Sequence, residues 1–221
     1  MKYIITPKQY KLLKEEEQKI LHIPSIDLFG GWDGLQEFIR SRGNPPYSIG
    51  GSLDFDYTTI ESLWTLTSVG GHLDLRGTSV KSLGNLTSVS GNLYLSNTPI
   101  ESLGNLTSVG GFLDLRGAPI KSLGNLTSVG GDLYLSQTPI ESLGNLTSVG
   151  GNLDLDNTIV KSLGDLTSVG GDLQLIGTPI KSLGNLTSVG GFLDLRYTSL
   201  AEKYTANQIR NMVSVDGMIY L

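Results

Sequence analysis

The feature that most constrains the fold is a regular internal repeat. From Gly51 to Gly190 the chain returns to the pattern GxLxLxxTPIxSLGNLTSVG every 20 residues, through seven complete coils without an insertion. A fixed period of this length is typical of a solenoid, in which each coil stacks on its neighbours and has no core of its own. We number the positions of a coil 1 to 20, with Gly51 and its equivalents at position 1.

Apolar residues occupy positions 3, 5, 10, 13, 16 and 19 of each coil. Positions 3 and 5 alternate with polar residues, which is the pattern of a half-buried strand. The spacing of the other apolar residues favours turns over a helix. We therefore expect one short strand per coil, parallel to its neighbours and about 4.8 Å from them. The predicted fold is mainly β, a right-handed parallel-strand solenoid with a helical N-terminal cap and a helical C-terminal segment.

Helix signals mark the N-terminal end, where the repeat is absent. We expect one helix near residues 7–21 and a second at 33–42, the latter with Asp33 and Gln36 as its capping box. Such segments would cover the first coil, because a solenoid otherwise exposes its core at each end.

The C-terminal end also loses the repeat. Ser199 and Glu202 form one expected capping box, and Thr205 and Gln208 form another. The strand motif returns at 214–221, which gives an expected total of nine strands. The length suits a single domain, divided into an N-terminal cap (1–46), repeat coils (47–198) and a C-terminal cap (199–221).

The repeat at 48–200 resembles leucine-rich repeats, with Thr at position 8, as in Thr78 and Thr98, where that family has Asn. Ala118 interrupts this column. The string SVGGxLxL is most similar to the receptor L-domain type, and the start of the chain resembles small proteins of tailed phages. The resemblance implies a solenoid that binds ligands or partner proteins, such as an adhesin or a host-directed inhibitor.

Composition excludes several classes of function. The net charge is −5, without a long Lys or Arg run, so we expect no nucleic-acid partner. There is no cysteine and there are only two histidines, so we expect no metal site and no cofactor. No apolar stretch is long enough for membrane insertion and no signal peptide is evident, so we expect a soluble protein, cytoplasmic rather than secreted.

Catalysis has one candidate arrangement, because His72 would stack beside Ser52 and share a face with Asp74. A flat, solvated strand face offers no oxyanion hole. We therefore expect a protein that is not an enzyme and has no catalytic residues.

Two other columns suggest stacking between coils. The Asn-Leu-Thr strings match glycosylation sequons, but their fixed place in the repeat favours an Asn ladder along the turns. Position 11 alternates in charge almost throughout, which favours ion pairs between neighbouring coils. These position 11 residues are Glu61, Lys81, Glu101, Lys121, Glu141, Lys161 and Lys181.

The candidate binding surface is the outward strand face, where positions 2, 4 and 6 vary from coil to coil. Two tyrosines should flank a carboxylate, with a phenylalanine and guanidinium groups nearby, and could hold a sugar ring or a basic peptide side chain. The residues are Arg76, Tyr94, Phe112, Asp114, Arg116 and Tyr134. A duplicated two-coil unit that avoids stacking like charges would give the same variation.

The sequence therefore predicts a non-enzymatic binding or protein-interaction module with a protein or glycan partner. The alternative is a structural component of a larger assembly, including a phage assembly. A further alternative is an ice-binding solenoid, because Thr and Ser recur at positions 17 and 18. We expect a turn rather than a flat strand at this Thr-Ser pair, which disfavours ice binding.

Overall fold

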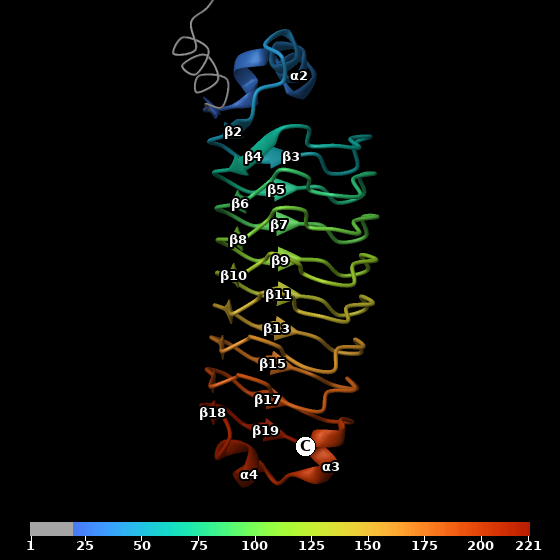
Figure 1. Ribbon diagram of the computed structural model, residues 1–221, viewed down its shortest axis with the longest axis vertical. Coiled ribbons are helices and arrows are strands. Elements are labelled where there is room, and N and C mark those ends of the chain that lie inside the picture. The colour runs from blue at the N-terminus through green and yellow to red at the C-terminus, as the bar shows by residue number, and fades with distance from the viewer. Residues whose placement is uncertain (1–19) are drawn as a thin grey trace, which may run out of the picture.

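Every coil of the repeat contributes a strand at two places, and the strands form two parallel sheets that run the length of the molecule (Figure 1). The computed structural model describes residues 20–221. The sheet that contains the predicted strand motif, which we call sheet B, has nine strands, as predicted. The other sheet, which we call sheet A, has ten. The chain is therefore a mainly β parallel solenoid, but the prediction of one strand per coil was wrong.

Sheet A contains the Ser-Val pairs at positions 18 and 19. Its strands, in sheet order, are β1 (Leu21–Ile23), β2 (Tyr47–Ile49), β4 (Leu66–Val69), β6 (Ser88–Val89), β8 (Ser108–Val109), β10 (Ser128–Val129), β12 (Ser148–Val149), β14 (Ser168–Val169), β16 (Ser188–Val189) and β18 (Ser214–Val215).

Sheet B contains the predicted strand motif at positions 3 and 4. Its strands are β3 (Leu53–Asp54), β5 (Leu73–Asp74), β7 (Leu93–Tyr94), β9 (Leu113–Asp114), β11 (Leu133–Tyr134), β13 (Leu153–Asp154), β15 (Leu173–Gln174), β17 (Leu193–Asp194) and β19 (Ile219–Tyr220). Within the repeat, both sheets pair each residue with its equivalent 20 positions away.

The corner between the two sheets requires glycine because stacked backbones come very close there. At position 1, which is glycine in every coil, a Cβ built on Gly131 would lie 2.9 Å from the carbonyl carbon of Gly111 in the preceding coil. Stacking at this corner therefore leaves no room for a side chain.

The core consists of the six predicted columns of apolar side chains. In one central coil the members of these columns are at most 2% exposed: Leu133, Leu135, Ile140, Leu143, Leu146 and Val149. Since each coil buries its side chains only against its neighbours, stability depends on stacking.

At the N-terminal end, helix α2 (Trp32–Ser41) confirms the helix predicted at 33–42. Its N-cap is Gly31 without a side-chain cap, so the predicted Asp33 capping box was wrong. A short 3-10 helix, η1 (Ile26–Phe29), precedes it. Most of the helix expected at 7–21 lies outside the described residues, and Leu21 belongs to β1 instead.

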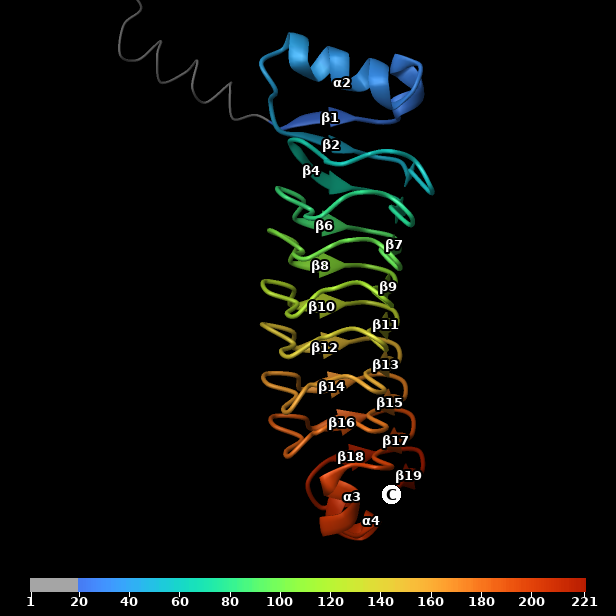
Figure 2. The same ribbon diagram turned by 90° about the vertical axis from the view of Figure 1, so that its right-hand side faces the viewer.

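The C-terminal end carries helices α3 (Ser199–Lys203) and α4 (Ala206–Arg210), which lie below the last coils (Figure 2). Thr198, not Ser199, caps α3, whereas the predicted capping box of Thr205 and Gln208 is present at α4. The Ser199 hydroxyl donates to the Ile180 carbonyl instead.

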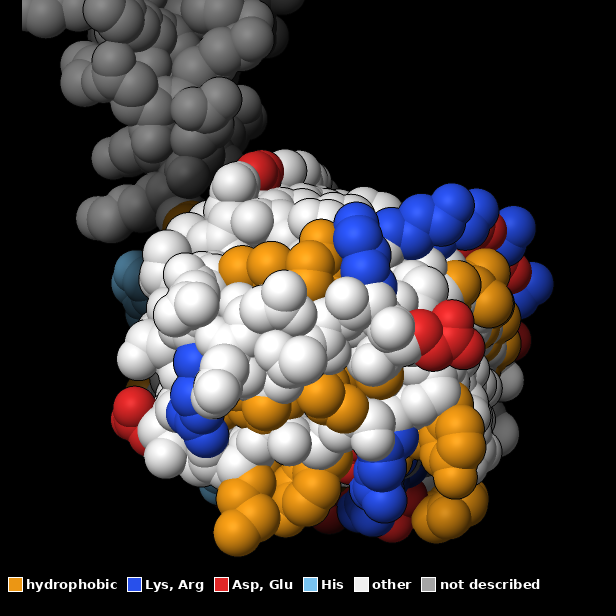
Figure 3. Space-filling model, turned by 90° about the horizontal axis from the view of Figure 1, so that it is seen from below, with side chains coloured by type: hydrophobic (Ala, Val, Ile, Leu, Met, Phe, Trp, Pro, Cys, Tyr) orange, Lys and Arg blue, Asp and Glu red, His pale blue; other side chains and the backbone are white. Residues whose placement is uncertain are grey.

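The last strand motif resumes both sheets despite the altered spacing. Ser214 pairs with Ser188, and Ile219 pairs with Leu193. Apolar side chains are visible on this end of the molecule (Figure 3); those exposed around the last strand are Met212, Met218, Tyr220 and Leu221.

Candidate binding face on sheet B

The side chains at position 2 act as hydrogen-bond acceptors between coils. The Ser52 hydroxyl accepts from the His72 backbone N–H at 2.9 Å, and Nδ1 of His72 accepts from the Asn92 backbone N–H at 2.8 Å. Asn92 Oδ1 accepts in turn from the Phe112 backbone N–H at 3.1 Å. His72 therefore uses Nδ1 for the backbone of the next coil, and the Ser52 hydroxyl bonds to backbone rather than to the imidazole ring, unlike a catalytic triad.

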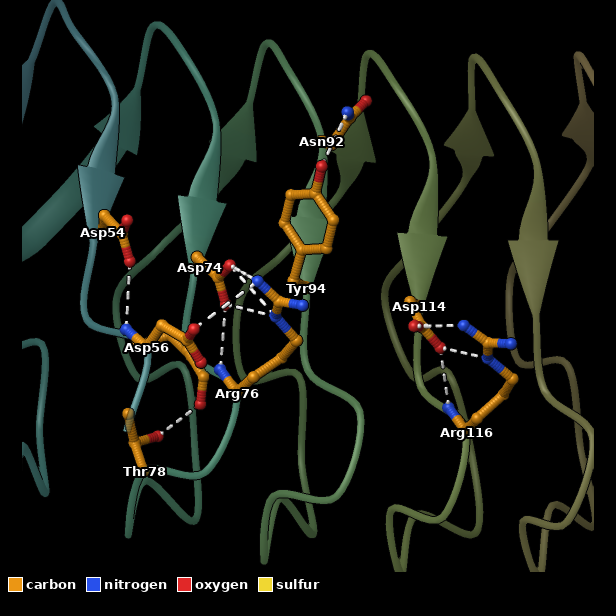
Figure 4. Close-up of polar contacts among 10 residues, drawn as sticks. Asp54, Asp56, Asp74, Arg76, Thr78, Asn92, Tyr94, Asp114 and Arg116 are labelled. Carbon is orange, nitrogen blue, oxygen red and sulfur yellow. Dashed lines mark hydrogen bonds and ion pairs between the residues drawn. The ribbon is translucent and has the colours of Figure 1, made fainter. Parts of the chain in front are cut away.

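Asp114 ends β9 and Arg116 lies two residues later, in the turn that follows the strand. Both side chains lie on the outward side of sheet B, where they pair. The guanidinium group donates from Nε to Oδ1 at 2.9 Å and from Nη2 to Oδ2 at 2.8 Å. The Arg116 backbone N–H also donates to Oδ1 at 3.1 Å. The carboxylate expected between two tyrosines is thus already held in a bidentate pair (Figure 4).

Burial of Asp114 by itself would raise its pKa. The hydrogen bonds and positive charge of Arg116 outweigh burial and hold the pKa of Asp114 below its usual value. The hydrogen bond to Asp114 correspondingly raises the pKa of Arg116. The pair is therefore charged at neutral pH.

The aromatic residues of the predicted site pack edge to face on successive coils. The ring centroids of Tyr94 and Phe112 are 4.8 Å apart at 87°, and those of Phe112 and Tyr134 are 6.3 Å apart at 68°. The guanidinium carbon of Arg76 lies 5.1 Å from the Tyr94 centroid, and that of Arg116 lies 5.1 Å from the Tyr134 centroid. These contacts restrain the rings.

All six predicted site residues therefore come together in one continuous row along sheet B. We call this row the ridge; its members are Arg76, Tyr94, Phe112, Asp114, Arg116 and Tyr134. Its hydroxyl groups are also held, since Tyr134 donates to Asp132 Oδ2 at 2.7 Å and Tyr94 accepts from Asn92 Nδ2 at 3.3 Å.

A second set of residues, equivalent to part of the ridge, lies at the C-terminal end and was not predicted. Arg196 Nη2 lies 2.6 Å from Asp194 Oδ2. The ring of Tyr220 lies 5.6 Å from the Arg196 guanidinium carbon and 5.7 Å from the centroid of Phe192. The identical string FLDLR at 112–116 and 192–196 is a signal that could have identified this copy.

With the Asp74–Arg76 pair at 2.5 Å, an Asp–Arg pair against a tyrosine occurs three times on the same sheet. The tyrosines are Tyr94, Tyr134 and Tyr220. Each pair lies in one coil and its tyrosine in the next coil, so the arrangement depends on stacking.

The outward face of sheet A is different, because its ladder is made of threonine. Thr147 donates from both its backbone N–H and its hydroxyl to the Thr127 carbonyl, at 2.9 and 3.0 Å. The same hydroxyl bond recurs along the whole repeat. A shallow groove of about 730 Å³ follows the neighbouring Ser, Val and Gly residues of positions 18 to 20.

The other predicted columns contribute little between coils. Among the asparagines of position 15, we find only two long side-chain bonds, from Asn125 to the Gly104 carbonyl at 3.5 Å and from Asn185 to Asp165 at 3.4 Å. The predicted Asn ladder was therefore wrong. At position 11, only Lys121 and Glu141 lie within ion-pair distance, at 3.7 Å.

Thr78 at position 8 is buried and donates to the carbonyl of Leu75 in its own coil at 2.7 Å. The other threonines of this column make the same bond. Ala118 is also buried, so this column fills space even where it lacks a hydroxyl.

The part of the chain from residue 20 onward contains no group of three or more His, Asp or Glu placed to hold a metal ion. None of its helices is long and apolar enough to cross a membrane. Comparisons with protein-family models, with curated proteins and with solved structures found no match to this chain.

Proposed function

We propose that this protein is a non-enzymatic binding module and that the outward face of sheet B binds a protein or glycan partner. The observation that supports this best is the threefold recurrence of an Asp–Arg pair against a tyrosine on one face. Tyr and Arg are the residues that most often dominate binding energy at interfaces.

The ridge is suited to binding because its side chains are already ordered. Each guanidinium group donates from both Nε and Nη2 to its aspartate yet remains half exposed, with 42% of the Arg76 side chain and 55% of the Arg116 side chain accessible. A partner that binds such residues loses little conformational entropy in ordering them.

The charge of the ridge limits the class of partner. Every arginine in it is paired with an aspartate, and the whole chain has a net charge of −5. A protein or glycan surface rich in hydrogen-bond acceptors fits this face better than the phosphate backbone of a nucleic acid.

The proposal includes the finer points of the sequence prediction. The coils would wind right-handed, as parallel crossovers usually do, and the two helical ends would act as caps. The resemblance to L-domain repeats and to tailed-phage proteins supports a role in recognition. A structural role in a larger assembly, such as that of a phage, is the alternative.

To test the proposal, Tyr94, Phe112 and Tyr134 are replaced together by Ser, and partners are captured from a host extract with the wild type and the variant. We expect a melting temperature close to the wild-type value and loss of one reproducible protein or glycan partner. Gln174→Ser, at position 4 of a coil outside the ridge, is the matched control. Unchanged capture by the triple variant would contradict the proposal and leave the aromatic residues as packing groups.

Ice binding is a second candidate, because Ser and Val at positions 18 and 19 are strands of a ten-stranded sheet rather than a turn. The objection that no flat strand carries these hydroxyls therefore no longer holds. Thermal hysteresis of the purified protein tests this candidate directly. If an ice crystal in the protein solution grows as soon as the temperature falls below its melting point, the protein does not bind ice.

A further inference from the structure

The junction between α2 and the first coil encloses a cavity of about 620 Å³, apart from the ridge. From α2 it is lined by Trp32, Gln36 and Arg40, and from the first coil by Phe55 and Trp64, among others. The chain has only two tryptophans, and both lie here. Polar residues line the rest of it, including Asp33, Glu61 and three hydroxyl residues. A cavity of this size that combines aromatic walls with converging polar groups fits a small polar ligand.

Trp64 occupies a backbone conformation that disfavours it. Its φ is +56°, and position 14 is glycine in the next six coils, with φ between +58° and +61°. A left-handed conformation costs a residue with a side chain about 1–2 kcal/mol. Trp64 is also 47% exposed, so burial offsets only part of this cost. A bulky residue where the repeat uses glycine indicates that its side chain has a function.

The walls of the cavity are built from aromatic contacts between the two segments. Trp32 packs edge to face on Phe55, with centroids 4.7 Å apart. The guanidinium carbon of Arg40 lies 5.5 Å from the Trp64 ring centroid, and Arg40 Nε donates to the Gln36 carbonyl at 3.2 Å. These contacts hold the first coil against α2.

Gln36 contributes a hydrogen-bond acceptor without a partner. It is 3% exposed, and its Nε2 donates to the Tyr47 hydroxyl at 3.0 Å, which fixes the side-chain amide. Its Oε1 has no partner among the described residues. A buried acceptor left in this way costs about 1–3 kcal/mol. The oxygen is closed off from solvent, so a hydroxyl donor from a bound molecule would offset this cost once the neighbouring side chains shift to admit it.

The charged groups favour a neutral ligand. Asp33 and Glu61 line the cavity and would disfavour an anion. Arg40 lies against Trp64 and would repel a cation from that ring. Carboxylates, a guanidinium group and an amide oxygen can all hydrogen-bond to hydroxyl groups, and aromatic rings can pack on an apolar ring face.

We propose that this cavity binds a sugar ring, with Trp32 and Trp64 as its apolar contacts and Gln36 and Arg40 as its hydrogen-bonding groups. The site uses no residue of the ridge, so it stands or falls independently of the function proposed above.

The two tryptophans make the test direct, because tryptophan fluorescence, excited selectively over that of the nine tyrosines, reports only on this region. The full-length protein is titrated with glucose, galactose, mannose, N-acetylglucosamine and their disaccharides, and calorimetry then measures the affinity for any sugar that changes the emission. We expect a saturable change with at least one of them. No saturable change with any of these sugars would overturn the proposal.

Trp64→Gly is the decisive variant, since it restores the residue that the other coils carry. We expect an equal or higher melting temperature together with at least about tenfold weaker sugar binding, a change of about 1.4 kcal/mol. Tyr57→Gly is the matched control, because Tyr57 also has a positive φ, +52°, in the same coil but does not line the cavity. It should relieve similar strain and leave sugar binding unchanged.

Three outcomes of these experiments would contradict the proposal. If Trp64→Gly binds sugar as tightly as the wild type, or melts at a lower temperature, Trp64 serves the fold rather than a ligand. If choline changes the fluorescence and no sugar does, the cavity recognises a cation and its assignment to a sugar is wrong.

Discussion

On sheet A, every repeat coil presents Thr at position 17 and Ser at position 18, whereas on sheet B the residues at positions 4 and 6 change from coil to coil. The Thr147 hydroxyl on sheet A bonds to the coil before it. The Asp114 carboxylate on sheet B bonds to Arg116 within its own coil. Both faces belong to the same coils and have the same spacing between strands.

The difference shows which bonds restrict the sequence. The bond between coils on sheet A needs a hydroxyl donor at position 17, and Thr supplies it in every coil. The bond between coils at position 2 of sheet B needs only an acceptor, which Ser52, His72 and Asn92 all supply. A pair within one coil needs only its own two members, so its neighbours are free to differ. Variation can therefore accumulate on sheet B without disturbing the stack, which suits a recognition surface.

The two sheets also differ in where they begin, because sheet A starts with β1 and sheet B with β3. Removing the N-terminal end should therefore have the largest effect on stability. Deleting residues 1–46 removes β1 and α2, so sheet A loses its first strand while sheet B keeps all nine. We expect aggregation or loss of the cooperative thermal transition, because Leu53 and Phe55 lose their cover. A truncated protein that stays monomeric with an unchanged melting curve would show that this segment is no cap.

The inward and outward sides of sheet B should differ strongly. Leu135→Ala should lower the free energy of unfolding by about 2–5 kcal/mol because it leaves a cavity in a stacked column. Ser136→Ala, on the outward side, should change it hardly at all. Urea denaturation measures both, and equal losses would contradict the assignment of the two sides.

Breaking the ion pair between Asp114 and Arg116 within one coil should lower the free energy of unfolding by less than the core substitution does. Asp114→Asn should reduce stability at neutral pH by about 1 kcal/mol, since it replaces a charged bidentate pair with a half-exposed arginine. Because the native pKa of Asp114 is lowered, the carboxylate stabilises the fold above its unfolded pKa. That contribution is lost as pH falls from about 4 through the lower native value.

Denaturation at a series of pH values tests this expectation. The difference between wild type and Asp114→Asn should shrink below about pH 4. Asp154→Asn is the control, because the residue at position 6 of that coil is Asp156 and no arginine pair is lost. A difference that is constant from neutral to acid pH would show that the Asp114–Arg116 charge pair does not stabilise the fold.

The smallest effect is expected on sheet A. Thr147→Val keeps the branched shape and removes one hydroxyl bond, while the backbone N–H still satisfies the Thr127 carbonyl. The loss should be about 0.5 kcal/mol, at the low end for a hydrogen bond. Chemical denaturation against Ser148→Ala measures it. A loss larger than that of Asp114→Asn would reverse the comparison of the two faces.

Much of the candidate site could be predicted, since parallel stacking in a fixed register places every twentieth residue side by side. That rule brought Tyr94, Asp114 and Tyr134 together. It could not show that Asp114 is held by Arg116 or that the rings pack edge to face, because these depend on side-chain conformation. It also missed Arg196 and Tyr220, which are related across the altered spacing of the last coil.

The second sheet was not visible in the sequence because its apolar residue at position 19 has no apolar neighbour two positions away, whereas positions 3 and 5 on sheet B alternate with polar residues. Ser and Val at positions 18 and 19 form a strand only when the next coil supplies the same two residues as hydrogen-bond partners. The glycines at position 1, such as Gly131, likewise signal a turn in the sequence, but the contact that requires them is between coils.

The sequence by itself determined the period, the six inward columns and the helix at the N-terminal end, because hydrophobic spacing is a local property of a chain. Only the tertiary structure decided the cavity between α2 and the first coil. Trp32 and Trp64 are 32 positions apart, and neither the left-handed backbone of Trp64 nor the unpaired oxygen of Gln36 can be deduced from spacing. Such properties arise when a segment outside the repeat packs on a coil, where no periodic rule applies.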